Sequence, residues 1–336
     1  PTTAVTRLRR LRHGLHRADP GSALGQITPG WRRPDLPPGP TLPKPCVTAP
    51  ILRAVRALIE HLRDLWRARE LLDQLVRKEL KVRYKHSALG FAWSLLTPVL
   101  MTVVFTVVFR FLIRIEVDDF AAFFVAGYLV WSFFQNSVQG SIQAITGNGP
   151  LIRKVYFPRE VLPLSNVFAQ GVHFMLAVLA IGPYLVWTRG GEVITYLPAV
   201  LLGIVLITVF ACGLAMLFAA LNVTFRDLQE LVVVVFLVWF YATPIIYPYE
   251  LAVGAAGESS VGRVFLSVIR LNPMTWFVRL FRQPLYGVGQ LGTGNSLAPS
   301  WPSGEVLVGT TIVAFGSFVV GYLVFHRFAL TFAKQV

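Results

Sequence analysis

Charged residues and cysteine are scarce in this sequence. Charged residues fill 14% of the 336 positions, whereas a soluble domain carries about a quarter, and hydrophobic residues fill 54%. The two cysteines, Cys46 and Cys212, lie in a polar stretch and in a long apolar run, so we expect no disulfide between them. This composition excludes a soluble globular domain and predicts an all-α polytopic membrane protein.

Motifs for ATP and metal chemistry are also missing. The sequence has no G-x-x-x-x-G-K-[ST] loop for the phosphates of ATP and no Cys/His cluster with the spacing of a metal site. His173 stands alone in an apolar run, which is typical of a packing residue. The predicted membrane spans have no carboxylate near their centres, which disfavours ion-coupled carriers. We therefore expect no enzyme activity, no metal and no cofactor in this chain.

Cations, by contrast, gather at one end. The net charge is +14, and residues 1–90 hold 18 Lys and Arg against 7 Asp and Glu. Residues 1–50 also hold 10 of the 22 prolines, so we expect a disordered, basic, proline-rich cytoplasmic tail. Beside a membrane domain, such a tail favours anionic membrane lipids over nucleic acid as its partner.

Residues 51–90 show helical periodicity, with apolar residues on one face and cations on the other. This pattern predicts amphipathic helices that lie in the membrane interface, with their cations towards lipid phosphate. The cations of the second such helix are Arg77, Lys81, Arg83 and Lys85.

Residues 91–336 predict a transmembrane domain of six spans, because its apolar runs reach the roughly 20 residues that cross a bilayer. The spans are 91–113, 120–145, 161–187, 193–221, 231–247 and 306–325. With an inner amino terminus, the inner segments carry 24 of the 31 cations, so the positive-inside rule places both termini in the cytoplasm.

The segment between spans five and six is apolar but interrupted. Its stretch "FLSVIRLNPMTWFVRLFRQPLYG" (265–287) carries three arginines and the Asn272-Pro273 pair. We expect two short re-entrant helices on the outer side that meet at this pair, with a seventh and an eighth span as the alternative.

Two predicted spans carry polar or aromatic faces. On span two the residues recur at three- and four-residue steps: Tyr128, Trp131, Gln135, Gln139 and Gln143. On span five the face consists of Phe236, Trp239, Phe240, Thr243 and Tyr247. Amides bind hydroxyl groups and aromatic rings cover the apolar faces of pyranoses, so these faces favour a path for sugars. The alternative is ordinary helix packing through glutamines and rings.

Six segments carry a specific pattern. They are "RYKHSALGFAWSLLTPVL" (83–100), "GYLVWSFFQNSV" (127–138), "LIRKVYFPREVLPLS" (151–165), "NVTFRDLQEL" (222–231), "TPIIYP" (243–248) and "LNPMTWFVRLFRQPLYG" (271–287). In this order they resemble the permease subunits of ABC-2 type polysaccharide exporters, which include the O-antigen, teichoic acid and galactan export permeases. The resemblance runs from about residue 70 to the end and leaves residues 1–70 unassigned.

The resemblance implies export of a lipid-linked polysaccharide across the bacterial cytoplasmic membrane. It implies two copies of this chain and two separate ABC ATP-binding subunits, which would hold ATP and Mg. It also implies an interfacial helix over about 71–87 and short outer helices over about 264–286. The channel would be lined by spans one, two and five, which adds Phe105 and Phe109 to the two faces.

The family's coupling helix would fall on the charged loop after span two. Tyr156 and Phe157 would anchor in a cleft of the ATP-binding subunit, and Pro158 would end the helix. Charged residues would fix the register through ion pairs at the rim of this docking site: Arg153, Lys154, Arg159 and Glu160. The alternative is a basic loop that only sets topology.

On the outer side, we expect the short helices to act as a gate. Its three arginines would lie near the phosphate or pyrophosphate of lipid headgroups. They are Arg270, Arg279 and Arg282.

Three other functions stay open at this point. The same layout serves exporters of drugs or small lipids. A membrane glycosyltransferase also handles lipid-linked sugars, and Asp118-Asp119 is the only acidic pair that could serve it. A scaffold or channel without an ATP-binding partner is the third.

The double substitution Tyr156→Ala with Phe157→Ala tests the docking loop. We expect the variant to stay folded and dimeric but to lose the ATP-binding subunits, because buried aromatic anchors carry most of the energy of an interface. Co-purification of those subunits and polysaccharide at the cell surface are the two measurements. If both survive the substitutions, the docking hypothesis fails.

Overall fold

The computed structural model describes residues 68–84, 92–115, 117–155, 157–225, 227–256, 260–287 and 298–335. The predictions for the tail over 1–50, for the first interfacial helix, and for Lys85 and Tyr156 lie outside the described residues, as does the side chain of Arg83.

Every regular element of the described ranges is a helix. In chain order the helices are α2 (Arg69–Tyr84), α3 (Ala92–Thr106), η1 (Val107–Leu112), α4 (Phe120–Ser141), η2 (Thr146–Asn148), α5 (Gly149–Lys154), α6 (Val161–Arg189), η3 (Gly191–Tyr196), α7 (Leu197–Thr224), α8 (Leu228–Tyr241), α9 (Tyr249–Ala256), α10 (Ser260–Leu271), α11 (Pro273–Leu285) and α12 (Gly304–Gln335). The prediction of an all-α protein is confirmed for this part of the chain.

Five helical stretches of the described residues are long and apolar enough to cross a membrane. They are Leu95–Leu112 (α3 with η1), Phe120–Ser141 (α4), Val161–Arg189 (α6), Gly191–Thr224 (η3 with α7) and Gly304–Ala329 (α12). These stretches overlap the predicted spans one to four and span six, so the sequence located five spans correctly.

Span five is shorter than predicted. α8 has 14 residues, and at about 1.5 Å per residue it is roughly 21 Å long, less than the hydrocarbon core of about 30 Å. Pro244 explains why the helix does not continue to Tyr247, because proline lacks an N–H group and disfavours a helical backbone in the residue before it. The predicted span over 231–247 is therefore corrected to α8 followed by a turning segment, 242–248.

The predicted break at Asn272-Pro273 is confirmed. α10 ends at Leu271, α11 begins at Pro273, and the two axes are bent by 71°. Asn272 caps α11, since its side chain accepts a hydrogen bond from the backbone N–H of Met274, and proline suits the first turn of a helix. Taken as one bent unit, the pair is long and apolar enough to be a sixth span.

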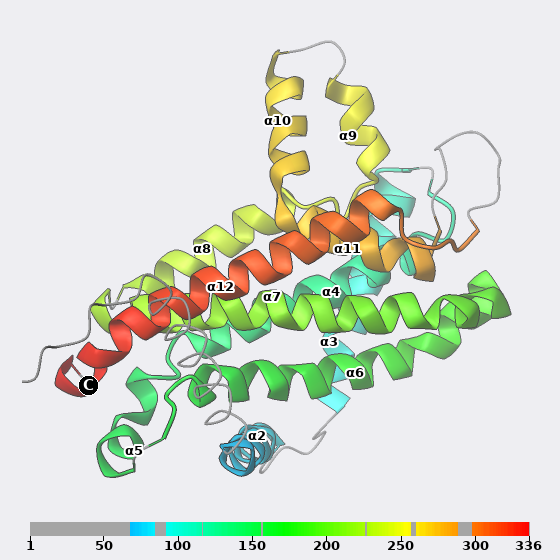
Figure 1. Cartoon of the computed structure of the whole chain (residues 1–336). Helices are drawn as coiled ribbons and strands as arrows, with labels where there is room; N and C mark the ends of the chain where they lie inside the picture. The colour runs from blue at the N-terminus through cyan, green and yellow to red at the C-terminus, as the bar shows by residue number, and fades with distance from the viewer. Residues whose placement is uncertain are drawn as a thin grey trace, which may run out of the picture. The chain divides into compact units, whose positions relative to one another are not determined.

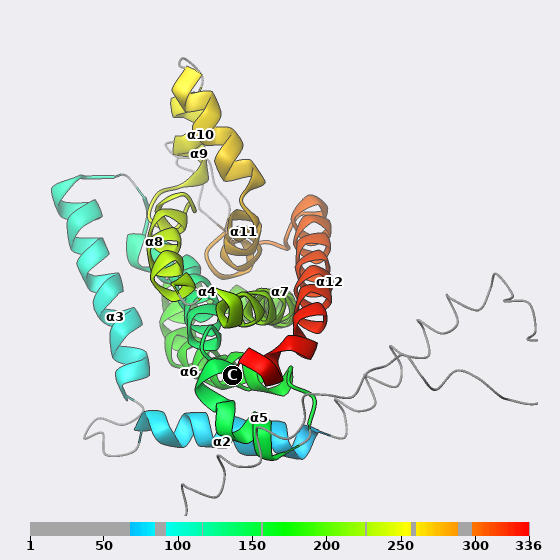
Figure 2. The same cartoon turned by 90° about the vertical axis from the view of Figure 1, so that its left-hand side faces the viewer.

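α4 lies at the centre of the main hydrophobic core. Within the chain, 72% of its span is buried, against 6% of the α3–η1 span. α4 packs on α3, α6, α7, α8 and α11, whereas α3 stands at the edge of the helix group in Figure 2. Much of the α3 surface is thus left uncovered by the rest of the described chain.

Hydrogen bonds fix which helix ends lie together. Tyr184, near the end of α6, donates from its hydroxyl to a carboxylate oxygen of Asp119 at the start of α4, at 2.9 Å. At the other end, the hydroxyl of Ser141 in α4 donates to the carbonyl of Pro163 near the start of α6, at 3.2 Å. α4 and α6 therefore run in opposite directions, and Figure 1 shows α5 and the end of α12 on the same side of the group.

α2 crosses the direction of the long helices. It is seen end-on in Figure 1, where α7 is seen lengthwise, and lengthwise in Figure 2. Leu75 of α2 is buried in a second, smaller core with Ile145 and Val161, on which Ile152 of α5 also packs. This second core joins α2 and α5 to the ends of α4 and α6.

Two glycines let α7 and α12 approach until their backbones touch. A Cβ added to Gly321 would lie 1.9 Å from the carbonyl oxygen of Gly213, and one added to Gly213 would lie 2.6 Å from the backbone of Ser317 and Phe318. Close approach at small residues is a common way for membrane helices to associate. The α7–α12 contact thus depends on the absence of side chains at both positions.

The substitution Gly321→Ala tests this contact. We expect a lower thermal unfolding midpoint for the purified chain, because the new methyl group overlaps the α7 backbone and overpacking costs about 1–3 kcal/mol. Gly316→Ala is the matched control on the same helix, since its added Cβ meets nothing within 4 Å. Equal midpoints for the two variants would contradict the contact.

Candidate functional site

Rings from three helices form one aromatic cluster. We define it as Phe105, Phe109, Tyr128, Trp131, Phe236, Trp239 and Phe240. The centroid of Trp131 on α4 lies 5.9 Å from Phe236, 6.2 Å from Trp239 and 5.6 Å from Phe240, all on α8. The structure therefore brings the predicted faces of spans two and five together.

Span one joins this cluster through Phe105. Its ring lies 5.8 Å from Phe109, 6.3 Å from Phe240 and 4.8 Å from Phe124. Phe124 also stacks on Tyr128 at 5.2 Å and so connects α3 with α4. Sequence reasoning missed Phe124, although it lies one helical turn before Tyr128 and the spacing could have found it.

The rings of the aromatic cluster differ in exposure. Trp131 and Phe236 are buried, whereas Phe105, Tyr128 and Trp239 are half-buried. A ligand would therefore meet Phe105, Tyr128 and Trp239 before it reached Trp131.

Glutamines continue the cluster along α4 as an amide ladder, which we define as Gln135, Gln139 and Gln143. The indole N–H of Trp131 donates to Oε1 of Gln135 at 2.8 Å, and Nε2 of Gln135 donates to Oε1 of Gln139 at 3.5 Å. Both bonds run along α4 and hold no second helix. Only further along does Gln143 donate to Oε1 of Gln229 on α8. Helix packing thus accounts for Gln143 but leaves Gln135 and Gln139 for another role.

Tyr247 lies apart from this path. Its ring is 6.4 Å from Phe265 of α10, and its hydroxyl donates to the carbonyl of Tyr241 at 3.1 Å. The prediction that Tyr247 continues the face of α8 is wrong, because α8 ends at Tyr241.

The predicted docking residues divide into two groups. Arg153 and Lys154 end α5 and are exposed, while Glu160, at the start of α6, is only 4% exposed. Phe157 is half-buried against the second core, and Arg159 donates to the carbonyl of Ala329 in α12. The rim role predicted for Glu160 is therefore corrected, because its carboxylate lies inside the chain.

Pro158 does not end α5, the helix that precedes it. α5 ends at Lys154, and Val155 takes an extended backbone with φ −130° and ψ 135°. Pro158 is half-buried further along this extended connection to α6. The predicted role of Pro158 is thus corrected from ending α5 to shaping the link that follows it.

α2 covers the implied interfacial helix as far as Tyr84, and the remaining residues 85–87 lie outside the described residues. Its cations Arg77 and Lys81 are exposed, and Nε of Arg77 bonds Asp73 at 2.8 Å. Lys78 lies 3.5 Å from the side-chain oxygen of Asn148, just before α5. On α2, Arg77 and Lys81 are thus exposed, while Lys78 contacts the segment just before α5.

The three arginines predicted to form an outer gate do not form one group. Nε of Arg270 donates to the hydroxyl of Tyr249 at 3.3 Å, and the guanidinium of Arg279 lies 5.3 Å from the centre of the same ring. Arg282 is only 9% exposed and lies 3.7 Å from the ring centre of Phe123. The lipid contact predicted for Arg282 is therefore corrected, whereas Arg270 and Arg279 lie together at Tyr249.

Asn272 is a residue whose side chain the sequence analysis did not consider. Its Oδ1 accepts from the indole N–H of Trp239 at 2.7 Å, and its Nδ2 donates to the carbonyl of Ala242 at 3.1 Å and to the hydroxyl of Thr243 at 2.9 Å. Asn-Pro between apolar helices signals a break but gives no sign of these partners. The amide thus joins the aromatic cluster to the bend between α10 and α11.

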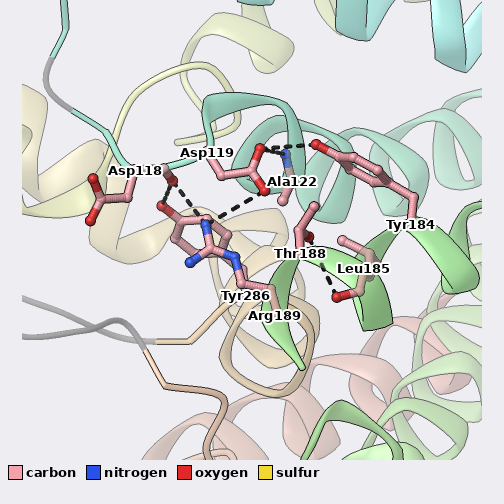
Figure 3. Close-up of polar contacts among 8 residues, drawn as sticks. All are labelled: Asp118, Asp119, Ala122, Tyr184, Leu185, Thr188, Arg189 and Tyr286. Atoms are coloured by element: carbon pink, nitrogen blue, oxygen red, sulfur yellow. Dashed lines mark hydrogen bonds and ion pairs between the residues drawn. The ribbon is translucent and has the colours of Figure 1, made fainter. Parts of the chain in front are cut away.

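Figure 3 shows the polar contacts that involve Asp118 and Asp119. Oδ1 of Asp119 accepts from Tyr184 and, at 3.3 Å, from the backbone N–H of Ala122, which caps α4. Arg189 lies 4.0 Å from the other Asp119 oxygen and donates to the backbone carbonyl of Asp118 at 2.9 Å. The Asp118 carboxylate points away from these groups in Figure 3. The described residues hold no group of three or more metal-binding side chains, here or elsewhere.

Tyr286 closes this polar group from α11. Its hydroxyl donates to the carbonyl of Asp118, and the guanidinium of Arg189 lies 4.0 Å from its ring centre. Burial raises the pKa of Tyr286 to about 12, so the phenol stays protonated and able to donate. The group therefore ties the ends of α6 and α11 to the start of α4, which is a structural role.

Comparison with known proteins gives a consistent result. Residues 70–286 match the family described as ABC-2 type transporter. The chain is similar to the O-antigen export system permease protein RfbA of Myxococcus xanthus, with 34% identity over 68% of this chain and 85% of that protein. RfbA of Klebsiella pneumoniae is 29% identical over 79% of this chain and 94% of its own length. The polysialic acid transport protein KpsM of Escherichia coli is 23% identical over 67% of this chain and 84% of its own length.

The two aspartates should respond differently to alanine. We expect Asp119→Ala to lower the thermal midpoint, because it removes a helix cap worth about 1 kcal/mol and leaves Tyr184 without its acceptor. Asp118→Ala should change little, because the bonds from Arg189 and Tyr286 go to its backbone carbonyl. Thermal unfolding and surface polysaccharide are the measurements. Loss of activity in both variants at unchanged stability would point to carboxylate chemistry instead.

Proposed function

Because the chain belongs to the family of ABC-2 type transporters, we propose that it is the transmembrane permease subunit of a polysaccharide exporter. Its substrate is a lipid-linked polysaccharide that crosses the bacterial cytoplasmic membrane, and separate ATP-binding subunits supply the energy. One observation carries the choice of substrate: the aromatic cluster runs directly into the amide ladder, through the Trp131–Gln135 bond.

A sugar polymer suits this combination. Aromatic rings cover the apolar faces of pyranoses, and side-chain amides offer a donor and an acceptor to hydroxyl groups. Within the path the rings of Phe105, Tyr128 and Trp239 are half-buried, and Gln135 and Gln139 are half-buried beyond them. A polymer could thus pass from stacking contacts to hydrogen-bonding contacts along one side of α4.

A second copy of the chain lines the other side of the path. α3 and α8 carry the aromatic cluster on one face, and their other faces expose apolar residues that nothing in the described chain covers. Large uncovered apolar faces mark contacts with lipid or with another protein. The exposed apolar residues of α3 and α8 include Val99, Leu100, Val103, Val104, Leu231, Val234, Leu237 and Val238.

ATP-binding subunits dock at α5 and the connection after it. Arg153 and Lys154 are exposed there, and Phe157 is half-buried beside Tyr156, whose side chain we assign to the cleft of the partner. A displacement of α5 would be transmitted to α2 and α6 through the second core, because Leu75 and Val161 belong to that core and Ile152 of α5 packs on it.

The membrane placement follows from the same assignment. α2 lies in the inner interface, since it crosses the long helices and exposes Arg77 and Lys81. α10 and α11 form the re-entrant pair on the outer side, where Arg270 and Arg279 lie near lipid phosphate. Both termini are then cytoplasmic, and the basic tail over 1–50 meets anionic lipids.

Deleting the chain in its host tests the proposal. We expect surface polysaccharide to disappear and lipid-linked polymer to accumulate inside. Gln135→Ala should accumulate in the membrane yet lower surface polysaccharide severalfold, because Trp131 and Gln139 lose their partner. Asn136→Ala is the matched control, since this exposed amide lies on the same helix and, among the described residues, bonds Ser132 at 3.4 Å.

Two results would overturn the proposal. One is unchanged surface polysaccharide in the deletion strain. The other is glycan movement in vesicles that contain this chain alone, without a nucleotide-hydrolysing partner.

A further inference from the structure

Asn272 has a partner for every hydrogen-bonding group of its amide. Oδ1 accepts from the Trp239 indole and from the backbone N–H of Met274, and Nδ2 donates to Ala242 and Thr243. The residue is only 7% exposed, so water does not replace these partners readily. Moving the Trp239 indole away would leave its N–H without an acceptor and Oδ1 with one donor instead of two, which is unfavourable.

The four bonds join three structural elements: the aromatic cluster, the first turn of α11 and the segment after α8. Trp239 is a half-buried ring of the aromatic cluster, Met274 lies in the first turn of α11, and Thr243 follows the end of α8. Thr243 links Asn272 to Trp239 a second time, because its hydroxyl also donates to the Trp239 carbonyl at 2.8 Å. Trp239 is thus tied to Asn272 both through its indole and through its backbone.

Arg282, near the other end of α11, also bonds the segment that follows α8. Its guanidinium donates to the carbonyls of Pro244 at 2.8 Å and Ile245 at 3.1 Å. Asn272 and Arg282 therefore hold the segment 242–245 at two points along α11. The end of α8 cannot shift against α11 without breaking several buried hydrogen bonds.

α10, on the other side of the bend, is much less restrained. Ile269 is its buried residue, whereas Val261, Val264 and Leu271 are 80%, 65% and 82% exposed. Figures 1 and 2 both show α9 and α10 projecting away from the long helices. A change in the angle at Asn272 would therefore move α10 while α11 keeps its packing.

We propose that Asn272 is a positioning residue that couples the indole of Trp239 to the bend between α10 and α11. When a sugar stacks on Trp239 and turns its indole, the indole N–H loses its acceptor and Oδ1 of Asn272 keeps only the Met274 donor, unless the bend adjusts. Occupancy of the aromatic path then changes the orientation of α10. This inference rests on the proposed function, because it takes the transported glycan as the molecule that turns Trp239.

Export in the native host tests the coupling. Trp239→Phe keeps a ring but removes the indole N–H, and Asn272→Ala removes the acceptor. We expect each to lower surface polysaccharide by about tenfold at equal membrane level, the scale of one buried group left unpaired. The double variant should be no lower than Asn272→Ala, because the two changes break the same bond.

Asn166→Ala is the matched control. Its amide also joins two helices, because Nδ2 donates to the carbonyl of Gly140 at 2.8 Å, but it touches no residue of the aromatic cluster. Export within about twofold of wild type is expected, since the variant leaves every partner of Trp239 and Asn272 in place.

A second measurement follows α10 itself. Val264→Cys in a Cys46→Ser background places an exposed thiol on α10, and Cys212 is buried. We expect its rate of labelling by a membrane-impermeant maleimide to differ between cells with and without polymer synthesis. Asn272→Ala should abolish that difference, which a residue with only a structural role would not do.

Several results would overturn the coupling. They are wild-type export in both single variants, losses that multiply in the double variant, and a labelling difference that survives Asn272→Ala. If the Asn272→Ala variant does not accumulate in the membrane, Trp239→Phe replaces it in the labelling measurement with Val264→Cys and Cys46→Ser, because Trp239→Phe keeps the asparagine. A labelling difference that survives Trp239→Phe would then overturn the coupling. Unchanged surface polysaccharide after deletion of the whole chain would instead refute the proposed function, so the two failures are distinguishable.

Discussion

Polar groups inside a membrane protein must find their partners within the protein, because the hydrocarbon core offers no water. Most of the site follows from this constraint. The Trp131 indole is paired with Gln135, the Trp239 indole with Asn272, and the Arg282 guanidinium with the carbonyls of the segment 242–245. The pairings of Trp239 and Arg282 also fix one helix or segment against a neighbour, whereas the Trp131–Gln135 bond stays within α4.

Hydropathy predicted the helices well where an apolar run is long. Five spans and the break at Asn272-Pro273 could be read from the sequence because each depends on local composition. α8 could not, because its length is set by Pro244 and by a following segment that is apolar but turns. Apolar composition does not show where a helix stops, and proline alone does not mark the end either, because Pro98 and Pro183 lie inside α3 and α6.

Charged residues were harder to place than apolar ones. Arg270 and Arg282 lie twelve residues apart in one stretch, yet the first is exposed and the second is buried on Phe123. Glu160 is buried, whereas Arg153 and Lys154, which precede it in the same loop, are exposed. Such differences depend on carbonyl and ring partners that come from distant parts of the chain, and a single sequence does not disclose them. The aromatic faces were easier, because residues three and four apart share a side of any helix.

The backbone contact between α7 and α12 limits which parts of the molecule can move during a transport cycle. With Gly213 and Gly321 in direct contact, neither helix can rotate about its axis without driving a side chain into its neighbour. Sliding is opposed in the same way, so the two helices form a fixed frame. A transport cycle then has to displace parts outside this pair, such as α3 and α8, against α7 and α12.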